Sequence, residues 1–285
     1  MGYLLTVLTR FFWATVQGVA GQLSIGMAGI FLLSLSVCFS FSAYSFAILS
    51  KNFTFSFWLT FVLSLGLTSL VGFLFSYLYT KVSKDSFTVL ALSSILGFDA
   101  LVKSFDGLTG GVLGISGILR PAFIGKLSSL AVFAGIMCLL VLTMHYFVVK
   151  SSLGRKIRAF KEHPVALESL GTSKDSISRF VIVWGAIISS VAGVLELMRL
   201  QFLDPSFGGI PNLILFVSIA ILALKPKVSS AVLASMFVVF VPEIISFLNF
   251  PSQFVGHLRS IFYCVLLIFL VRQVSGKFTI SKREI

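Results

Sequence analysis

The sequence has few charged residues. Only 11% of its 285 residues are Asp, Glu, Lys or Arg, whereas 57% are hydrophobic. An average soluble domain is about 25% charged, so this chain has too little polar side chain to cover a water-soluble particle. The shortage excludes a soluble enzyme, a disordered chain and a coiled coil. It indicates a protein whose main solvent is lipid.

Motifs for metal, redox and nucleophilic chemistry are also missing. The three cysteines, Cys38, Cys138 and Cys264, each lie in an apolar run, without CxxC or Cys/His spacing. We therefore expect buried core thiols, with no disulfide framework and no bound metal. No Ser/His/Asp or paired-carboxylate arrangement occurs, so we expect no catalytic residues, and we expect the histidines in loops or at span ends.

A nucleotide-binding loop of the form GxxxxGK[ST] is absent from the sequence. Such a loop cradles nucleotide phosphates with its backbone N–H groups. We therefore expect no cofactor in this chain. If the protein uses ATP, a separate subunit must bind it.

Long apolar runs are what the sequence does contain. They are continuous, which favours helices over the alternating strands of a membrane barrel. The expected fold class is all-α, a polytopic transmembrane bundle of eight or nine spans that forms one domain over residues 1–285. The runs cover about 4–20, 22–46, 55–80, 86–103, 127–149, 179–202, 211–224, 227–248 and 255–272.

The basic residues are unevenly distributed. The net charge is +12, and 15 of the 22 Lys and Arg residues fall in 81–85, 150–179, 225–227 and 272–285. Basic residues collect in cytoplasmic loops of membrane proteins. We therefore expect these segments, and with them the C-terminus, in the cytoplasm of a cell (inner) membrane that the chain crosses several times. The same rule explains the charge without nucleic acid, which we do not expect as a partner.

The segment 150–178 is the one long polar stretch. Pro164 suits the first turn of a helix but not its interior, so RKIRAFKE and PVALESL are predicted to form two short helices. Gly171 falls where a left-handed residue ends a helix. Two interpretations remain open at this point. The unit lies on the membrane with its Arg and Lys facing anionic lipid, or it docks a cytoplasmic partner.

The motif GRKIRAFKEHPVALESLG resembles the cytoplasmic coupling loop of ABC importer permeases, above all those for branched-chain amino acids (and urea or amides). Other segments are similar to the same family in order and spacing. They are GVAGQLSIGMAG at 18–29, GLTGGVLGI at 107–115, LDPSF at 203–207 and VPEII at 241–245. The chain departs from the family at Met27, where the family has His, and at 220–235, which lacks the family's glycines.

The resemblance implies a set of partners and coupling residues. The partners are cytoplasmic ATP-binding subunits, a second permease subunit that is identical or paralogous, an extracytoplasmic solute-binding protein and membrane lipid. The residues implied in ATPase coupling are Arg155, Arg158, Glu162, Ala166, Glu168 and Gly171.

Two glycine-rich segments are candidates for the translocation path. Small residues allow helices to pack closely, but they also allow a chain to unwind and line a cavity with its backbone. Both interpretations stay open. The path residues expected on the second interpretation are Gln22, Ser24, Thr109, Gly110 and Gly111.

Three carboxylates lie in apolar runs and suggest an alternative function. An intramembrane acid is a candidate for ion coupling, so Asp99, Glu196 or Glu243 could serve an ion-coupled secondary transporter. However, Asp99 is spaced for a helical ion pair with Lys103, and Glu196 for one with Arg199. Glu243 has no obvious local partner. A polytopic membrane enzyme is a third possibility, but it would need a His/acid cluster that the sequence does not show.

Overall fold

The computed structural model describes residues 2–52, 55–118, 120–162, 164–169, 171–246, 258 and 261–272. Within them the chain is built from helices, and the one β pairing is an isolated bridge between Ile115 and Leu203. The elements are α1 (Gly2–Gly21), η1 (Gln22–Ala28), α2 (Leu35–Asn52), α3 (Phe57–Lys81), α4 (Lys84–Ser104), α5 (Asp106–Thr109), η2 (Gly111–Leu113), η3 (Ala122–Ile124), α6 (Leu127–Lys150), α7 (Ser152–Glu162), α8 (Pro164–Ser169), α9 (Lys174–Leu200), α10 (Ile210–Leu222) and α11 (Val228–Ser246). A further helix covers Ile261–Arg272.

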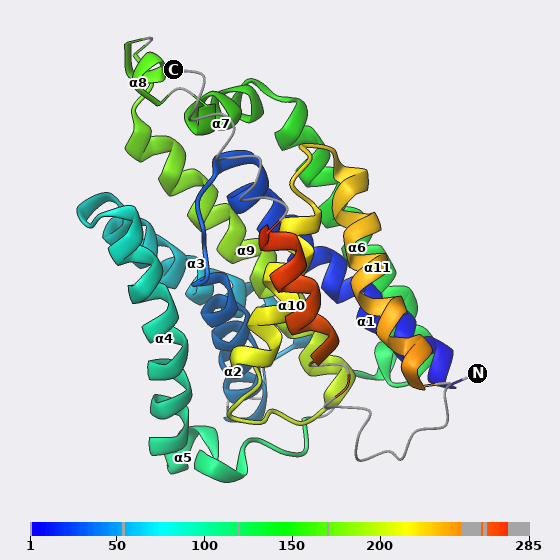
Figure 1. Ribbon diagram of the computed structural model, residues 1–285. Coiled ribbons are helices and arrows are strands. Elements are labelled where there is room, and N and C mark those ends of the chain that lie inside the picture. Colours follow the sequence, from blue (N-terminus) through cyan, green and yellow to red (C-terminus); the bar gives the residue numbers. More distant parts are fainter. Residues whose placement is uncertain are drawn as a thin grey trace.

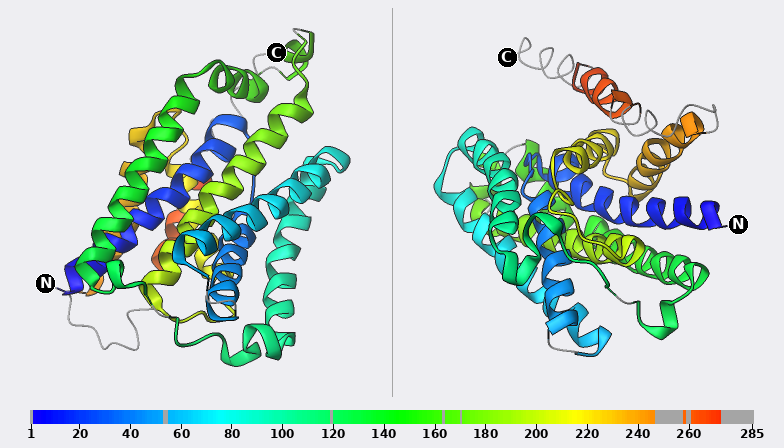
Figure 2. Two further views of the ribbon diagram at one scale, coloured as in Figure 1. Left: turned by 180° about the vertical axis from the view of Figure 1, so that it is seen from behind. Right: turned by 90° about the horizontal axis from the view of Figure 1, so that it is seen from below.

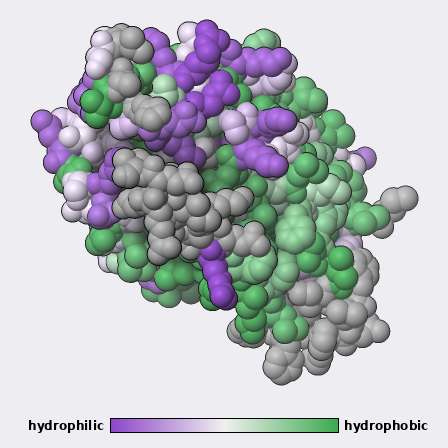
Figure 3. Space-filling view, turned by 45° about the horizontal axis from the view of Figure 1, so that its top comes forward, coloured by the Kyte–Doolittle hydropathy of each residue, from purple (hydrophilic) through white to green (hydrophobic). Residues whose placement is uncertain are grey.

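The helices confirm an all-α polytopic membrane protein. α3, α4, α6 and α9 are each long and apolar enough to cross a membrane, and Ile210–Leu222, Val228–Ile244 and Ile261–Arg272 are shorter apolar helices. Large apolar side chains such as Leu70, Leu139 and Phe147 are exposed on the flank of the bundle. Hydrophilic residues instead gather over the end that carries α7 and α8 (Figure 3). This distribution fits a bundle whose flank faces lipid.

α9 forms the centre of the bundle, with α1, α2 and α3 packed around it (Figures 1 and 2). In its most apolar window 78% of the residues are buried, against 22–39% in the other three long apolar helices. Small residues permit this packing. A Cβ added at Gly193 would lie 2.2 Å from the backbone oxygen of Phe39, and one added at Gly72 would lie 2.5 Å from Cβ of Ala186.

The expectation of one continuous span over 22–46 is wrong. The chain forms the π-helical segment η1 at 22–28, passes through a non-helical stretch at 29–34 and only then enters α2. Gly29 ends η1 in the left-handed conformation, with φ of +68°. Residues with a Cβ adopt this conformation at a steric cost that glycine avoids. Glycine at position 29 therefore favours the end of η1 at this point.

Two of the three cysteines are buried as expected, Cys38 in α2 and Cys138 in α6. Cys264 is exposed on the helix Ile261–Arg272, so the expectation of a buried thiol is wrong there. The reason is that an apolar run does not distinguish a core-facing side chain from a lipid-facing one.

Candidate functional site

The polar segment between α6 and α9 folds into the two short helices predicted for it. Pro164 begins α8, and Gly171 follows α8 in the left-handed conformation with φ of +75°. The Gly171 N–H donates to the backbone oxygen of Glu168 over 2.9 Å, which ends the helix locally. The geometry predicted for Pro164 and Gly171 is therefore confirmed.

α7 is fixed on the bundle by its apolar face. Ile157 and Phe160 are buried, whereas Leu153, one turn earlier on the same helix, is exposed. The tight turn from α6 needs Gly154, where an added Cβ would lie 2.4 Å from the backbone oxygens of Val148 and Val149. α7 therefore leaves α6 at a fixed angle and lies across the end of the bundle (Figure 1).

The outer side of α7 and α8 is charged. Glu168 forms an ion pair with Lys174 over 2.8 Å. The side chain of Ala166 lies outside the described part of the structure. The remaining charged coupling candidates are Arg155 and Glu162, which are exposed, and Arg158, which is half-buried. These side chains are placed to meet a partner, but their role in coupling remains a prediction.

Lys161 connects α7 to η1. Its Nζ donates a hydrogen bond to the backbone oxygen of Gly26 over 2.8 Å. Its Cγ lies where an added Cβ on Gly29 would be only 3.0 Å away. Burial lowers the pKa of Lys161, and the neighbouring Glu162 partly opposes this shift. Local sequence patterns do not reveal this contact of Lys161, because its acceptor is 135 residues away in the chain.

Gln22 lies at the centre of a buried polar cluster, at the end of the bundle that carries α7. Its Nε2 donates to the backbone oxygens of Lys225 and Lys227, over 2.6 and 2.7 Å, and contacts Ser230 Oγ at 2.7 Å. Its Oε1 lies 3.1 Å from Nε2 of His145. The cluster of Gln22, His145 and Ser230 therefore ties η1 to α6 and to the turn between α10 and α11.

His145 corrects an expectation. It was expected in a loop or at a span end, but it is fully buried within α6 and contacts Gln22. His163 and His257 lie outside the described residues. No local spacing could have revealed the pair, because 123 residues separate Gln22 from His145.

The predicted path residues fall into two distant groups. Gln22 and Ser24 lie in η1, near α7, whereas Thr109, Gly110 and Gly111 lie beyond α4 at the opposite end of the bundle (Figure 1). Ser24 Oγ donates to the backbone oxygen of Ala20 over 3.0 Å, and Thr109 Oγ1 to that of Val102 over 2.6 Å. In this conformation both hydroxyls stabilise the backbone, and a role in translocation remains a prediction.

Close helix packing and unwound backbone both occur in the glycine-rich segments, whereas a translocation cavity lined by this backbone remains a prediction. Gly18 and Gly21 allow α1 to pack closely on α10, since added Cβ atoms would lie 2.5 Å from Ile219 Cγ2 and 2.6 Å from Ala220 Cβ. Gly110 instead has φ of +72° and ends α5. Gly18 and Gly21 therefore allow close helix packing, whereas Gly110 allows the chain to leave the helix.

The loop before α6 is tied to the end of α9. Arg120 donates from Nε to the backbone oxygen of Met198 over 2.6 Å and from Nη2 to that of Arg199 over 2.9 Å. A cation at a helix C-terminus satisfies its free carbonyls. Burial, followed by repulsion from Arg199, lowers the pKa of Arg120. Apart from an isolated basic residue, no sequence pattern indicates this contact.

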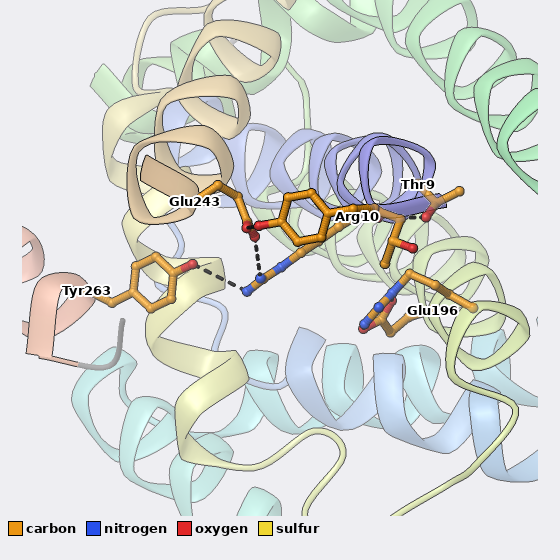
Figure 4. Close-up of polar contacts among 8 residues, drawn as sticks. Thr9, Arg10, Glu196, Glu243 and Tyr263 are labelled. Carbon is orange, nitrogen blue, oxygen red and sulfur yellow. Dashed lines mark hydrogen bonds and ion pairs between the residues drawn. The ribbon is translucent and has the colours of Figure 1, made fainter. Parts of the chain in front are cut away.

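Glu243, which has no obvious partner nearby in the sequence, finds distant ones in the fold. It forms an ion pair with Arg10 over 3.2 Å and accepts a hydrogen bond from the hydroxyl of Tyr3 (Figure 4). Arg10 also lies 3.4 Å from the hydroxyl of Tyr263. These contacts join the N-terminal half of α1 to the C-terminal end of α11. Arg10 and Glu243 are 233 residues apart, so no helical spacing could reveal the pair.

The two ion pairs expected from helical spacing are present. Arg199 donates twice to Glu196, over 2.6 and 2.5 Å, and Lys103 donates to Asp99 over 2.7 Å. With Glu243 bound by Arg10, each of the three intramembrane acids has a cation beside it. A paired carboxylate has a structural explanation and needs no ion-coupling role.

Comparison with known proteins identifies a family. The family model described as "Branched-chain amino acid transport system / permease component" matches residues 3–271. Two relatives are named "High-affinity branched-chain amino acid transport system permease protein LivM", one from Salmonella typhimurium (strain LT2) and one from Escherichia coli (strain K12); each is 24% identical to this chain over 221 residues. The matched part covers 67% of this chain and 51% of each relative, so the chain spans about half the length of the curated relatives it matches. No solved structure matches the chain significantly.

Proposed function

This chain belongs to the family of branched-chain amino acid transport permease components, and we propose that it is the membrane permease subunit of an ATP-driven ABC importer for branched-chain amino acids or similar small polar solutes. The observation that carries the proposal is the placement of α7. Its apolar face and Lys161 hold it against η1, while Arg155 and Glu162 face outward. A surface helix fixed to a break in a membrane helix can transmit the motion of a partner into the bundle.

ATP is bound and hydrolysed on separate cytoplasmic subunits in this proposal. The sequence lacks the phosphate-binding loop that such hydrolysis needs. The charged side chains of α7 and α8 provide the docking surface for those subunits. The distribution of basic residues supports a cytoplasmic location for this segment and for the C-terminus.

The remaining partners meet other surfaces. A solute-binding protein would dock at the end opposite α7, where the segments around Ile115 and Leu203 pair. A second permease subunit, identical or paralogous, would enclose the path together with this chain. The exposed apolar flank of α3, α4 and α6 meets membrane lipid, with part of it available to the second permease.

Co-purification tests the proposal. We would isolate the wild-type chain in detergent from cells that also produce an ATP-binding subunit, and compare it with Gly171→Arg and with Glu162→Arg/Glu168→Arg. The matched control is Asp85→Arg, an exposed acid at the start of α4 on the predicted cytoplasmic side. We expect the ATPase to accompany the wild type and the control but not the other variants. An ATPase that never associates, with all variants folded, would overturn the proposal.

A further inference from the structure

A cavity of about 590 Å³ opens at the end of the bundle opposite α7. Its walls come from α1, α2, α9, α10, the segment 201–209 and Tyr263. Small-molecule sites typically measure about 300–1,000 Å³ and combine apolar walls with a few polar groups. Figure 4 shows Arg10, Glu196 and Tyr263, which contribute to its walls.

One wall of the cavity is aromatic. The rings of Phe39 and Phe207 are stacked with centroids 4.9 Å apart and planes 12° apart. Trp13 continues this wall, with its ring centroid 5.5 Å from that of Phe39. Leu215 adds a buried aliphatic side chain. Such a surface favours a branched apolar side chain, because each buried methyl or methylene contributes about 0.8 kcal/mol.

The other walls carry charges of both signs. Glu196 and Arg199 line the cavity as an ion pair whose side chains are only 9% and 18% exposed. Arg10 adds a cation, and the exposed Asp204 adds an anion at the rim. A ligand with a net charge would add an uncompensated charge to walls whose cations and anions are equal in number. A zwitterion adds no net charge and presents groups of both signs to walls that carry charges of both signs.

Two hydrogen-bond donors in the walls lack partners in the described part of the chain. They are Nε1 of Trp13, a residue only 4% exposed, and Nδ2 of Asn212. Buried donors are nearly always satisfied, and an unsatisfied one costs about 1–3 kcal/mol. Both groups donate and cannot accept through these atoms. The partner that would satisfy them is an acceptor such as a carboxylate.

We propose that this cavity is the substrate site, and that it binds a zwitterionic α-amino acid with a branched apolar side chain. Trp13 and Asn212 receive the carboxylate, Glu196 receives the ammonium group, and the aromatic wall of Phe39 and Phe207 receives the side chain. Arg199 holds the Glu196 carboxylate in place through two hydrogen bonds. This assignment deepens the proposed function and depends on it for the substrate class.

Binding to the purified full-length chain in lipid nanodiscs tests the assignment. Radiolabelled L-leucine would be displaced by unlabelled L-leucine, by isocaproate, which lacks the ammonium group, and by isoamylamine, which lacks the carboxylate. Hydrogen bonds to charged groups contribute about 1.5–3 kcal/mol, so each analogue should compete at least about tenfold more weakly than leucine. Equal competition by the analogues, or no displaceable binding at about 1 mM leucine, would overturn the assignment.

Substitutions locate the binding in this cavity. Asn212→Ala removes one carboxylate donor without breaking an ion pair, so it should fold normally. We expect it to weaken leucine binding about tenfold and to leave isoamylamine binding unchanged, since that ligand has no carboxylate. A merely structural loss would weaken both ligands. Leu215→Trp should abolish binding by filling the cavity, and the exposed Asn52→Ala is the matched control.

The outcomes separate this inference from the proposed function. Leucine binding requires no ATPase, and ATPase association requires no leucine. If the ATPase co-purifies but leucine does not bind, the cavity assignment is wrong and the permease function stands. If leucine binds with the expected selectivity but no ATPase associates, the ATP-driven mechanism is wrong instead. Wild-type affinity in both Asn212→Ala and Leu215→Trp would place the site elsewhere.

Discussion

Lys161 on α7 donates a hydrogen bond from its Nζ to the backbone oxygen of Gly26 in η1, over 2.8 Å. The acceptor belongs to a π-helical segment that interrupts the path from α1 to α2. Four residues earlier, Gln22 binds His145 and the turn between α10 and α11. A displacement of α7 would therefore act on η1 first, and through Gln22 on α6 and α10.

The environment of Lys161 predicts a distinct titration. Burial lowers its pKa below the ordinary value of 10.5, so the folded state binds this proton less tightly than the unfolded state. The destabilisation from this group is complete below the folded-state pKa and disappears as the pH rises from there to about 10.5. Both Lys161 and Lys156 have exposed side chains on α7, so the two differ in their surroundings and not in access to reagent. We expect Lys161, whose pKa is lowered, to react with an amine-acylating reagent at lower pH than Lys156. Mass spectrometry of peptides labelled between about pH 7 and 10 measures both, and identical profiles would contradict the lowered pKa of Lys161.

Because α2 and α9 are in close contact, we expect a methyl group added between them to lower the free energy of unfolding. Gly193→Ala would place a Cβ 2.2 Å from the backbone oxygen of Phe39, and overpacking of this kind costs about 1–3 kcal/mol. Gly97→Ala in α4 is the control, because nothing lies within 4 Å of its added Cβ. We expect thermal unfolding in detergent to shift downward for Gly193→Ala and to shift slightly upward for Gly97→Ala, since Ala favours helix by about 1 kcal/mol. Equal effects would show that α2 and α9 are not in close contact.

The polar cluster around Gln22 predicts energetic coupling between residues far apart in sequence. Gln22→Ala leaves the His145 ring and two backbone oxygens without their partner, at a cost of about 1–3 kcal/mol. A double-mutant cycle of Gln22→Ala and His145→Ala should show coupling of about 0.5–3 kcal/mol in unfolding free energy. The same cycle with Asp85→Ala in place of His145→Ala should be additive, because Asp85 lies in the first turn of α4. Additivity in both cycles would mean that Gln22 and His145 do not interact.

A largely buried ion pair and a more exposed one should differ in how much their loss lowers the free energy of unfolding. The side chains of Arg10 and Glu243 are 20% and 7% exposed, whereas those of Lys103 and Asp99 are 44% and 29% exposed. Breaking a buried pair leaves an uncompensated charge and costs about 3 kcal/mol, but an exposed pair contributes at most about 1 kcal/mol. We therefore expect Arg10→Gln to lower the unfolding midpoint markedly and Lys103→Gln to leave it nearly unchanged. The reverse order would contradict this assignment of burial.

The same pairs bear on the energy source of transport. Carboxylates held beside cations need no ion-coupling role, so a protonophore should not reduce leucine uptake into vesicles supplied with ATP. Glu243→Gln should likewise retain ATP-driven uptake in whatever fraction of the protein folds. Uptake that collapses with the proton gradient while ATP is maintained would favour the ion-coupled alternative.

Local signals in the sequence predicted α7 and α8 well. Pro164 and Gly171 act through their own backbone conformations, so their meaning does not depend on distant residues. The ion pairs of Glu196 and Asp99 were also predictable, because their partners are three and four residues away. In each case the determining interaction lies within one or two helical turns.

The break at 22–34 and the contacts of His145 and Glu243 could not be predicted in this way. Hydropathy is continuous across 22–46, and the interruption is stabilised by bonds from Gln22 to residues more than 120 positions away. Arg10 and Glu243 are 233 residues apart. Spacing rules describe neighbours on one helix, so contacts between helices of a membrane bundle remain hidden until the fold is known.

Coupling between α7 and the membrane bundle is tested most directly by measuring ATP hydrolysis and leucine uptake together in Lys161→Met. The variant would be reconstituted into liposomes with its ATPase and solute-binding protein, beside Lys156→Met as the control. We expect Lys161→Met still to bind the ATPase and hydrolyse ATP but to import leucine at least about tenfold more slowly, because α7 loses its hydrogen bond to η1. Uptake and hydrolysis at wild-type rates in both variants would contradict the claim that the contact between Lys161 and Gly26 couples α7 to the membrane bundle.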